Sequence, residues 1–188
     1  MNSIQSVLWR NPYDLSAELC QLRPDPSGWL LEGLVLIPAD GAPARCDYRV
    51  EIDEGWNAHR VELRLTGLRI ERQFELSSAD EHWHVDGMRD PALAGCTDVD
   101  LRVSPSTNTL PIRRLGLEVG AQASLRAAWV SFPELEVISS EQTYERITEQ
   151  TYRYRSGSFA ADIHVDEAGM VVTYGTKYWR REAAAARS

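Results

Sequence analysis

The sequence predicts an all-β fold: a large, strongly curved antiparallel sheet that forms a barrel-like meander around an apolar interior. Apolar and polar residues alternate along most of the chain, which is typical of strands with one buried and one solvated face. Turn residues interrupt these runs at short intervals, which favours hairpins. Of the 188 residues 43% are hydrophobic and 26% are charged, a globular composition, and we expect residues 1–188 to form a single domain.

The alternating runs define the expected strands. Tyr48, Val50 and Ile52, for example, alternate with charged residues, and Thr66-Gly67 and Ser156-Gly157 supply the permissive backbone of tight turns. We expect strands at 4–10, 16–23, 28–37, 44–52, 57–65, 68–76, 81–86, 97–103, 121–131, 134–142, 144–154, 158–164 and 169–175.

Two segments do not alternate. Residues 104–120 read as an ordered loop with a helical turn at 110–115. Residues 182–187 favour helix by composition, but so short a helix is not stable alone, and the tail 182–188 is expected to be poorly ordered.

A meander of short hairpins must close into a barrel or fold onto itself, because free strand edges promote aggregation. Residues 28–37 and 127–132 are apolar on both faces, so both faces of these strands must be covered. Either a second layer packs outside the sheet or the inside is a lined cavity, which is a first indication of ligand binding.

Composition excludes several classes of protein. The net charge of -8 argues against nonspecific binding of nucleic acid, which needs a basic surface. No apolar run is long enough to span a membrane as a helix. The N-terminal residues lack a basic start followed by an apolar run, so we expect no secretory signal and a cytoplasmic protein.

Metal and cofactor motifs are not expected. Cys20, Cys46 and Cys96 show no CxxC spacing and are expected to be reduced, buried thiols. His82 and His84 share one strand face with a carboxylate and could hold a metal, but the alternative is a solvated face. We expect no metal site and no cofactor.

Charged residues in apolar surroundings are the first candidates for function. Asp98 and Asp100 share a strand face, where paired carboxylates can act as acid and base or simply form salt bridges. Glu32 and Arg49 lie in or beside apolar strands, where a charge requires a partner.

The loop after 97–103 is the second candidate. Thr107, Asn108 and Thr109 precede Arg113 and Arg114, so the loop could offer several hydrogen-bond donors to a polar head group. The alternative is a self-bonded loop.

Aromatic residues are the third candidate, because aromatic faces stack on sugar rings and line lipid pockets. Trp83, Tyr152 and Tyr154 belong to this group. Aromatic residues are also common in the cores of β proteins.

Two runs, GCTDVDL at 95–101 and SPSTNTLPIRRL at 104–115, resemble the signature of the putative glycolipid-binding family of bacterial proteins. Leu31-Glu32-Gly33, Trp83 with Asp86-Gly87, and Tyr152-Arg153-Tyr154 fit the resemblance too, so it covers nearly the whole chain. The resemblance implies a barrel-like antiparallel fold, similar in shape to periplasmic carriers of lipidated cargo, and a glycolipid as ligand. It implies no catalytic residue.

Together these features predict a non-enzymatic carrier that buries an acyl chain in its apolar interior and binds a polar head group near the 104–116 loop. The predicted ligand-binding residues are Glu32, Arg49, Trp83, Asp98, Asp100, Thr107, Asn108, Thr109, Arg113, Arg114, Tyr152 and Tyr154. Two alternatives remain: a hydrolase or isomerase that uses carboxylates or a His in the same cavity, and an interaction domain with a packed core.

Overall fold

A single 15-stranded sheet forms the fold. The computed structural model describes residues 4–38, 43–67, 70–80 and 82–187, and the sheet order is β8-β7-β6-β5-β4-β3-β2-β1-β15-β14-β13-β12-β11-β10-β9. The first strands are β1 (Ile4–Arg10), β2 (Ala17–Asp25), β3 (Gly28–Ile37), β4 (Ala44–Ile52), β5 (Ala58–Gly67), β6 (Ile70–Ala79), β7 (His82–Val85) and β8 (Met88–Arg89). The others are β9 (Asp98–Leu101), β10 (Gln122–Val130), β11 (Val137–Thr148), β12 (Thr151–Ser156), β13 (Phe159–Val165), β14 (Val171–Tyr174) and β15 (Arg180–Arg187).

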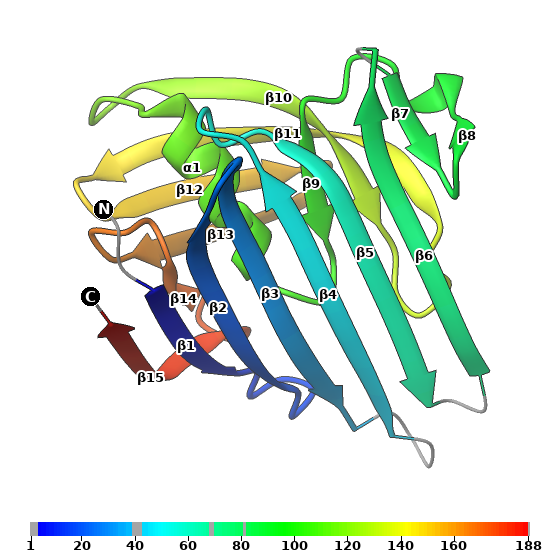
Figure 1. Cartoon of the computed structure of the whole chain (residues 1–188). Coiled ribbons are helices and arrows are strands. Elements are labelled where there is room, and N and C mark those ends of the chain that lie inside the picture. Colours follow the sequence, from blue (N-terminus) through cyan, green and yellow to red (C-terminus); the bar gives the residue numbers. More distant parts are fainter. Residues whose placement is uncertain (1–3, 39–42, 68–69, 81, 188) are drawn as a thin grey trace.

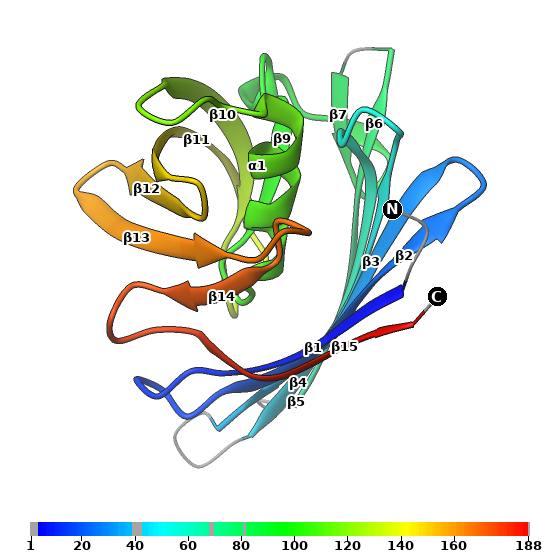
Figure 2. The ribbon, with the colours of Figure 1, turned by 90° about the vertical axis from the view of Figure 1, so that its left-hand side faces the viewer.

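The sheet folds onto itself without closing into a barrel. β1 pairs with β15, so the two ends of the chain meet in the middle of the sheet, and β8 and β9 are its edges. Figures 1 and 2 show the result: β1–β6 form one broad layer, β10–β14 curl back over its inner face, and α1 lies between the two halves. The predicted all-β fold and its strong curvature are confirmed.

Alternation along the strands places one face inside. In β4, Cys46, Tyr48 and Val50 are buried, whereas Arg45 and Arg49 point to the outer face. Cys20, Cys46 and Cys96 are free and buried, and desolvation raises the thiol pKa of Cys46 to about 12. These thiols are therefore core residues.

The single α-helix of the described residues ends at a glycine. α1 (Thr109–Leu115) follows a 3₁₀ turn, η2 (Ser106–Asn108), and stops at Gly116, which has a left-handed φ of 51°. Pro111 is tolerated because it lies in the first turn, where its missing N–H has no partner within the helix. Leu110 and Ile112 are buried against the core, so α1 covers part of the inner face.

Three details differ from the expectations. Residues 180–187 form β15, which pairs with β1 along its length, whereas the composition of 182–187 favours helix and a poorly ordered tail was expected. β9 pairs with β10 in parallel, an exception in an otherwise antiparallel sheet. β11 runs through the break expected between 142 and 144. Positions 68 and 81, where two strands were expected to begin, and position 188 lie outside the described residues.

No helix in the described part of the chain is both long and apolar enough to cross a membrane.

Candidate functional site

A cleft of about 730 Å³ lies beside the η2 turn that precedes α1. Its walls come from the 11–16 loop, the end of β9, η2, and strands β10–β14. Aromatic residues dominate the lining: Tyr13, Trp129, Phe132, Tyr154, Phe159, Tyr174, Tyr178 and Trp179. This is the size and the mixed character of a small-molecule site.

Asp100, on β9, supplies a carboxylate to the cleft. Gln142 Nε2 donates to Asp100 Oδ2 at 2.6 Å, and Tyr154 OH donates to the same oxygen at 3.3 Å. Burial raises the pKa of Asp100 to about 6, and the two hydrogen bonds offset that rise only in part. The carboxylate is thus desolvated, fixed in place, and ionised at neutral pH.

The aromatic rings form a connected platform beside this carboxylate. Phe159 and Tyr174 stack at 6.2 Å between centroids with an interplanar angle of 15°. Tyr154 meets Phe159 edge to face at 6.1 Å, and Tyr178 lies 5.7 Å from Phe159. Phe159, Tyr174 and Tyr178 are half-buried, so parts of their rings remain open to the cleft.

Asn108 contributes the η2 part of the wall. Its Oδ1 accepts a hydrogen bond from Tyr144 OH at 2.9 Å, and its Nδ2 donates to the Pro105 carbonyl at 3.0 Å. Asn108 therefore holds the η2 turn against β11. The structure brings together three of the predicted ligand-binding residues here: Asp100, Asn108 and Tyr154.

A buried polar network supports this wall from behind. Glu18 Oε1 accepts hydrogen bonds from Tyr48 OH and, at 2.7 Å, from Ser104 Oγ. Ser106 Oγ lies 2.8 Å from Tyr48 OH and 2.7 Å from Ser104 Oγ. Ser104 also lines the cleft. The network therefore joins β2 and β4 to the segment that follows β9.

Glu18 is the one carboxyl among these four residues, and 1% of its surface is exposed. Desolvation raises its pKa to about 8, although the hydrogen bonds from Tyr48 and Ser104 lower it. Its Oε2 is buried and has no hydrogen-bond partner among the described residues. Glu18 is therefore protonated at neutral pH.

Gly33 makes room for this network. A Cβ at position 33 would lie 2.2 Å from Tyr48 Cζ and 2.3 Å from its OH, so Gly33→Ala would push Tyr48 away from Glu18. We expect a loss of about 1–3 kcal/mol in the free energy of unfolding, the usual cost of overpacking. Urea denaturation at pH 7 measures it, and an unchanged midpoint and slope would show that Tyr48 has space to move.

Asp98 and Arg114 hold α1 to the sheet. Arg114 Nη2 makes an ion pair with Asp98 Oδ2, and Thr97 Oγ1 donates to the same oxygen at 2.7 Å. Burial raises the pKa of Asp98, and the contacts with Thr97 and Arg114 lower it. Neither Asp98 nor Arg114 lines the cleft.

Arg113 lies at the other end of the core. Its guanidinium carbon is 4.6 Å from the centroid of Trp56, which stacks on Trp29 at 5.0 Å. Arg113 is therefore also separate from the cleft, so the structure does not bring it together with Asn108 and Asp100 as predicted from the sequence.

Four more predicted residues make internal contacts. Trp83 Nε1 donates to the Cys96 carbonyl at 2.8 Å, and Tyr152 packs under Arg146 at 5.6 Å. Thr107 Oγ1 accepts from the Leu101 amide at 3.2 Å, and Thr109 Oγ1 lies 3.7 Å from the sulfur of Met170. All four are buried and none lines the cleft.

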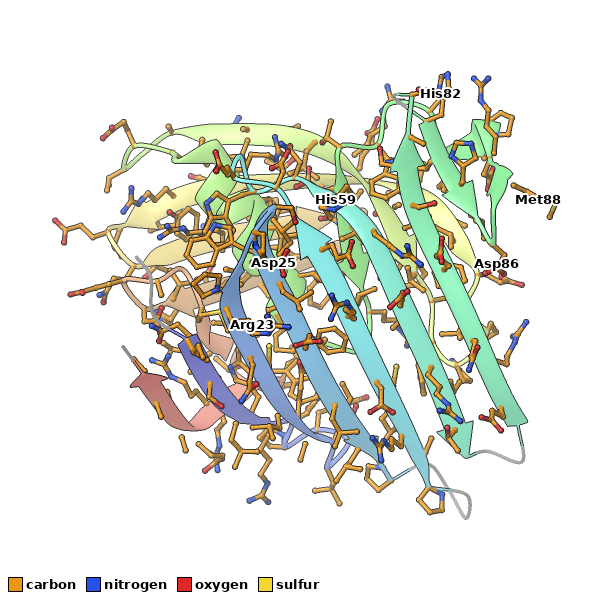
Figure 3. All side chains as sticks on the ribbon, in the orientation of Figure 1. Arg23, Asp25, His59, His82, Asp86 and Met88 are labelled. Atoms are coloured by element: carbon orange, nitrogen blue, oxygen red, sulfur yellow. The ribbon has the colours of Figure 1, made fainter. Side chains whose placement is uncertain are left out.

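Glu32 and Arg49 lie on the outer face of the sheet. Arg49 Nη1 is 2.9 Å from Glu32 Oε1, and Arg23 Nε is 3.2 Å from Glu32 Oε2. They line a shallow groove of about 840 Å³ among further charged side chains. Figure 3 labels Arg23, the second partner of Glu32, on β2. Glu32 and Arg49 are therefore partly exposed to solvent and neutralise each other on the outer face. They do not lie in the apolar interior.

No group of His, Cys, Asp and Glu side chains in the described part of the chain is arranged to hold a metal ion. His82 and His84 lie on β7, but they belong to no such group.

Sequence reasoning missed Glu18, Gln142, Phe159, Tyr174 and Tyr178. Glu18 shares a strand face with Cys20 and Leu22, which point inward, so its position on the buried face was a usable signal. Gln142 and Tyr174 gave no such signal, because their role depends on Asp100, Tyr154 and Phe159, which contact them through the fold.

Residues 6–181 match the model of the family described as "putative glycolipid-binding". A crystal structure of a DUF1089 family protein from Pseudomonas aeruginosa is similar at a TM-score of 0.78 and 36% sequence identity, covering 90% of this chain and 93% of that chain. No match was found among curated proteins. Since the family model spans nearly the whole sequence, the chain belongs to the putative glycolipid-binding family.

Proposed function

We propose that the protein is a non-enzymatic binding protein for a glycolipid or a related amphiphile, and that the cleft is its binding site. The observation that carries this proposal is the pairing of an aromatic platform, Phe159 and Tyr174, with the fixed carboxylate of Asp100 in one cleft. The family description supports the same ligand class.

The chemistry of a glycolipid fits these two features. The C–H faces of a sugar ring pack on aromatic rings, and its hydroxyl groups donate to a carboxylate. Gln142 and Tyr154 hold Asp100 in place, so little freedom is lost when a ligand binds.

The test is organic extraction of protein purified without detergent, followed by mass spectrometry. We expect a co-purifying glycolipid in near-stoichiometric amount. Phe159→Ala and Tyr174→Ala should each weaken binding of the identified lipid about 2–10-fold, the effect of losing one aromatic contact. Arg113→Ala, outside the cleft, is the matched control and should bind as the wild type does.

A protein that carries no lipid and takes up neither octyl glycosides nor a fluorescent acyl probe would refute the proposal.

A further inference from the structure

We infer that the glycolipid enters the cleft sugar first, that its head group carries no anionic group, and that its acyl chain leaves across the rim instead of entering the core. This orientation rests on the proposed function. It differs from that of a carrier that buries the lipid tail and leaves the head group in solvent.

The recessed part of the cleft is the part equipped to bind hydroxyl groups. Both hydrogen bonds to the Asp100 carboxylate go to Oδ2. Among the described residues no group donates to Oδ1, so that oxygen is available to a ligand. Ser140 and Ser156, whose hydroxyls lie 3.0 Å apart, add further polar groups to the same wall.

The charges of the lining disfavour an anionic head group. Asp14 and Asp100 are both carboxylates. Arg102 is the sole cation among the described lining residues, and its Nη1 donates to the Phe132 carbonyl at 2.6 Å. A phosphate or sulfate would meet two carboxylates and a single guanidinium, so the net charge of the lining repels it, whereas an uncharged sugar donates hydrogen bonds to the carboxylates.

The rim has the opposite character. Tyr13 is 72% exposed and Ile138 is 52% exposed, and both line the cleft together with Ile37 and Phe132. Leu15, in the same loop as Tyr13, is 65% exposed. Exposed apolar side chains gathered from several elements at one opening are a surface on which an acyl chain can lie.

Buried side chains of the described residues fill the core beside this cleft. α1 covers the neighbouring part of the inner face, and its Leu110 and Ile112 are buried. Leu101 and Met170 are buried to 1% or less. Because these side chains fill the core next to the cleft, a long acyl chain can leave the cleft only across the rim.

Matched probes separate the two orientations. The probes are the methyl and octyl glycosides of glucose, galactose and mannose, with 1-octanol and octyl phosphate as chain-only and anionic probes, measured by saturation-transfer NMR and calorimetry. We expect at least one methyl glycoside to bind, its octyl glycoside to bind more tightly, and octyl phosphate not to bind. Asp100→Asn should weaken both glycosides roughly tenfold or more.

Ile138→Glu, at an exposed position, should weaken the octyl glycoside and leave the methyl glycoside unchanged. This variant still decides the question if Asp100→Asn fails to fold. Octyl glycosides and 1-octanol binding equally well, with no methyl glycoside bound and no effect of Asp100→Asn, would overturn the sugar-first orientation and leave amphiphile binding intact. No binding of any probe would overturn the proposed function itself.

Discussion

Glu18→Gln should remove a large part of the pH dependence of stability between pH 4.5 and pH 8. The folded protein raises the pKa of Glu18 from 4.5 to about 8, so over this range the folded state binds one proton more than the unfolded state. Stability is therefore highest at the acidic end and falls as pH rises. At about 1.36 kcal/mol per pKa unit, the loss amounts to about 5 kcal/mol.

The amide of Gln reproduces the neutral acid. Its oxygen can still accept from Tyr48 and Ser104, and its NH₂ group takes the place of Oε2, which has no partner among the described residues. The variant should match the wild type at pH 5 and exceed it at pH 9.

Urea denaturation at the two pH values measures the difference, with Glu62→Gln, a partly exposed carboxyl on the outer face, as the control. Parallel pH profiles for Glu18→Gln and wild type would mean that Glu18 is ionised throughout. Because Ser104 lines the cleft, ionisation of Glu18 above pH 8 should also weaken ligand binding.

The sequence predicts what depends on local pattern. Alternation in 44–52 gives β4 and the inward direction of Tyr48 and Val50, and both are confirmed. The shared face of Asp98 and Asp100 also follows from a period of two.

Contacts between distant segments have no such local signal. Glu18 meets Ser104 across 86 positions, and Gln142 meets Asp100 across 42. The partner of each carboxylate depends on how the two halves of the sheet fold together. The alternation of apolar and polar residues carries no information about that packing. Asp98 and Asp100 consequently have different surroundings, an ion pair for one and the cleft for the other.

The tail shows how tertiary pairing overrides propensity. Glu and Ala favour helix, and a segment as short as 182–187 was expected to be poorly ordered. In the structure Leu8 pairs with Ala183 and Val7 with Ala184, and β15 connects β1 to β14 in the sheet. The hydrogen bonds and packing of a central strand outweigh a preference of a few tenths of a kcal/mol per residue.

Arg114→Ala should destabilise the protein by about 3–5 kcal/mol, the usual cost of leaving a buried charge without its partner. Asp98 is 2% exposed, and Arg114 is the only cation that contacts it among the described residues. Arg113→Ala is the matched control, since it changes the neighbouring residue of the same helix. It should cost about 0.5–1 kcal/mol, because it removes a partly exposed contact with Trp56.

The pH dependence identifies the cause of the loss. Without Arg114, the contact that lowers the pKa of Asp98 is gone, and burial should raise that pKa further. A carboxyl whose folded-state pKa is raised gives most stability at low pH, so the deficit of Arg114→Ala should shrink as pH falls from 8 to 5. The double variant Asp98→Asn, Arg114→Ala should recover much of the loss at pH 8, because no buried charge is left unpaired. A deficit that is independent of pH and is not recovered in the double variant would mean that Arg114 acts by packing α1 against β9, and not by neutralising Asp98.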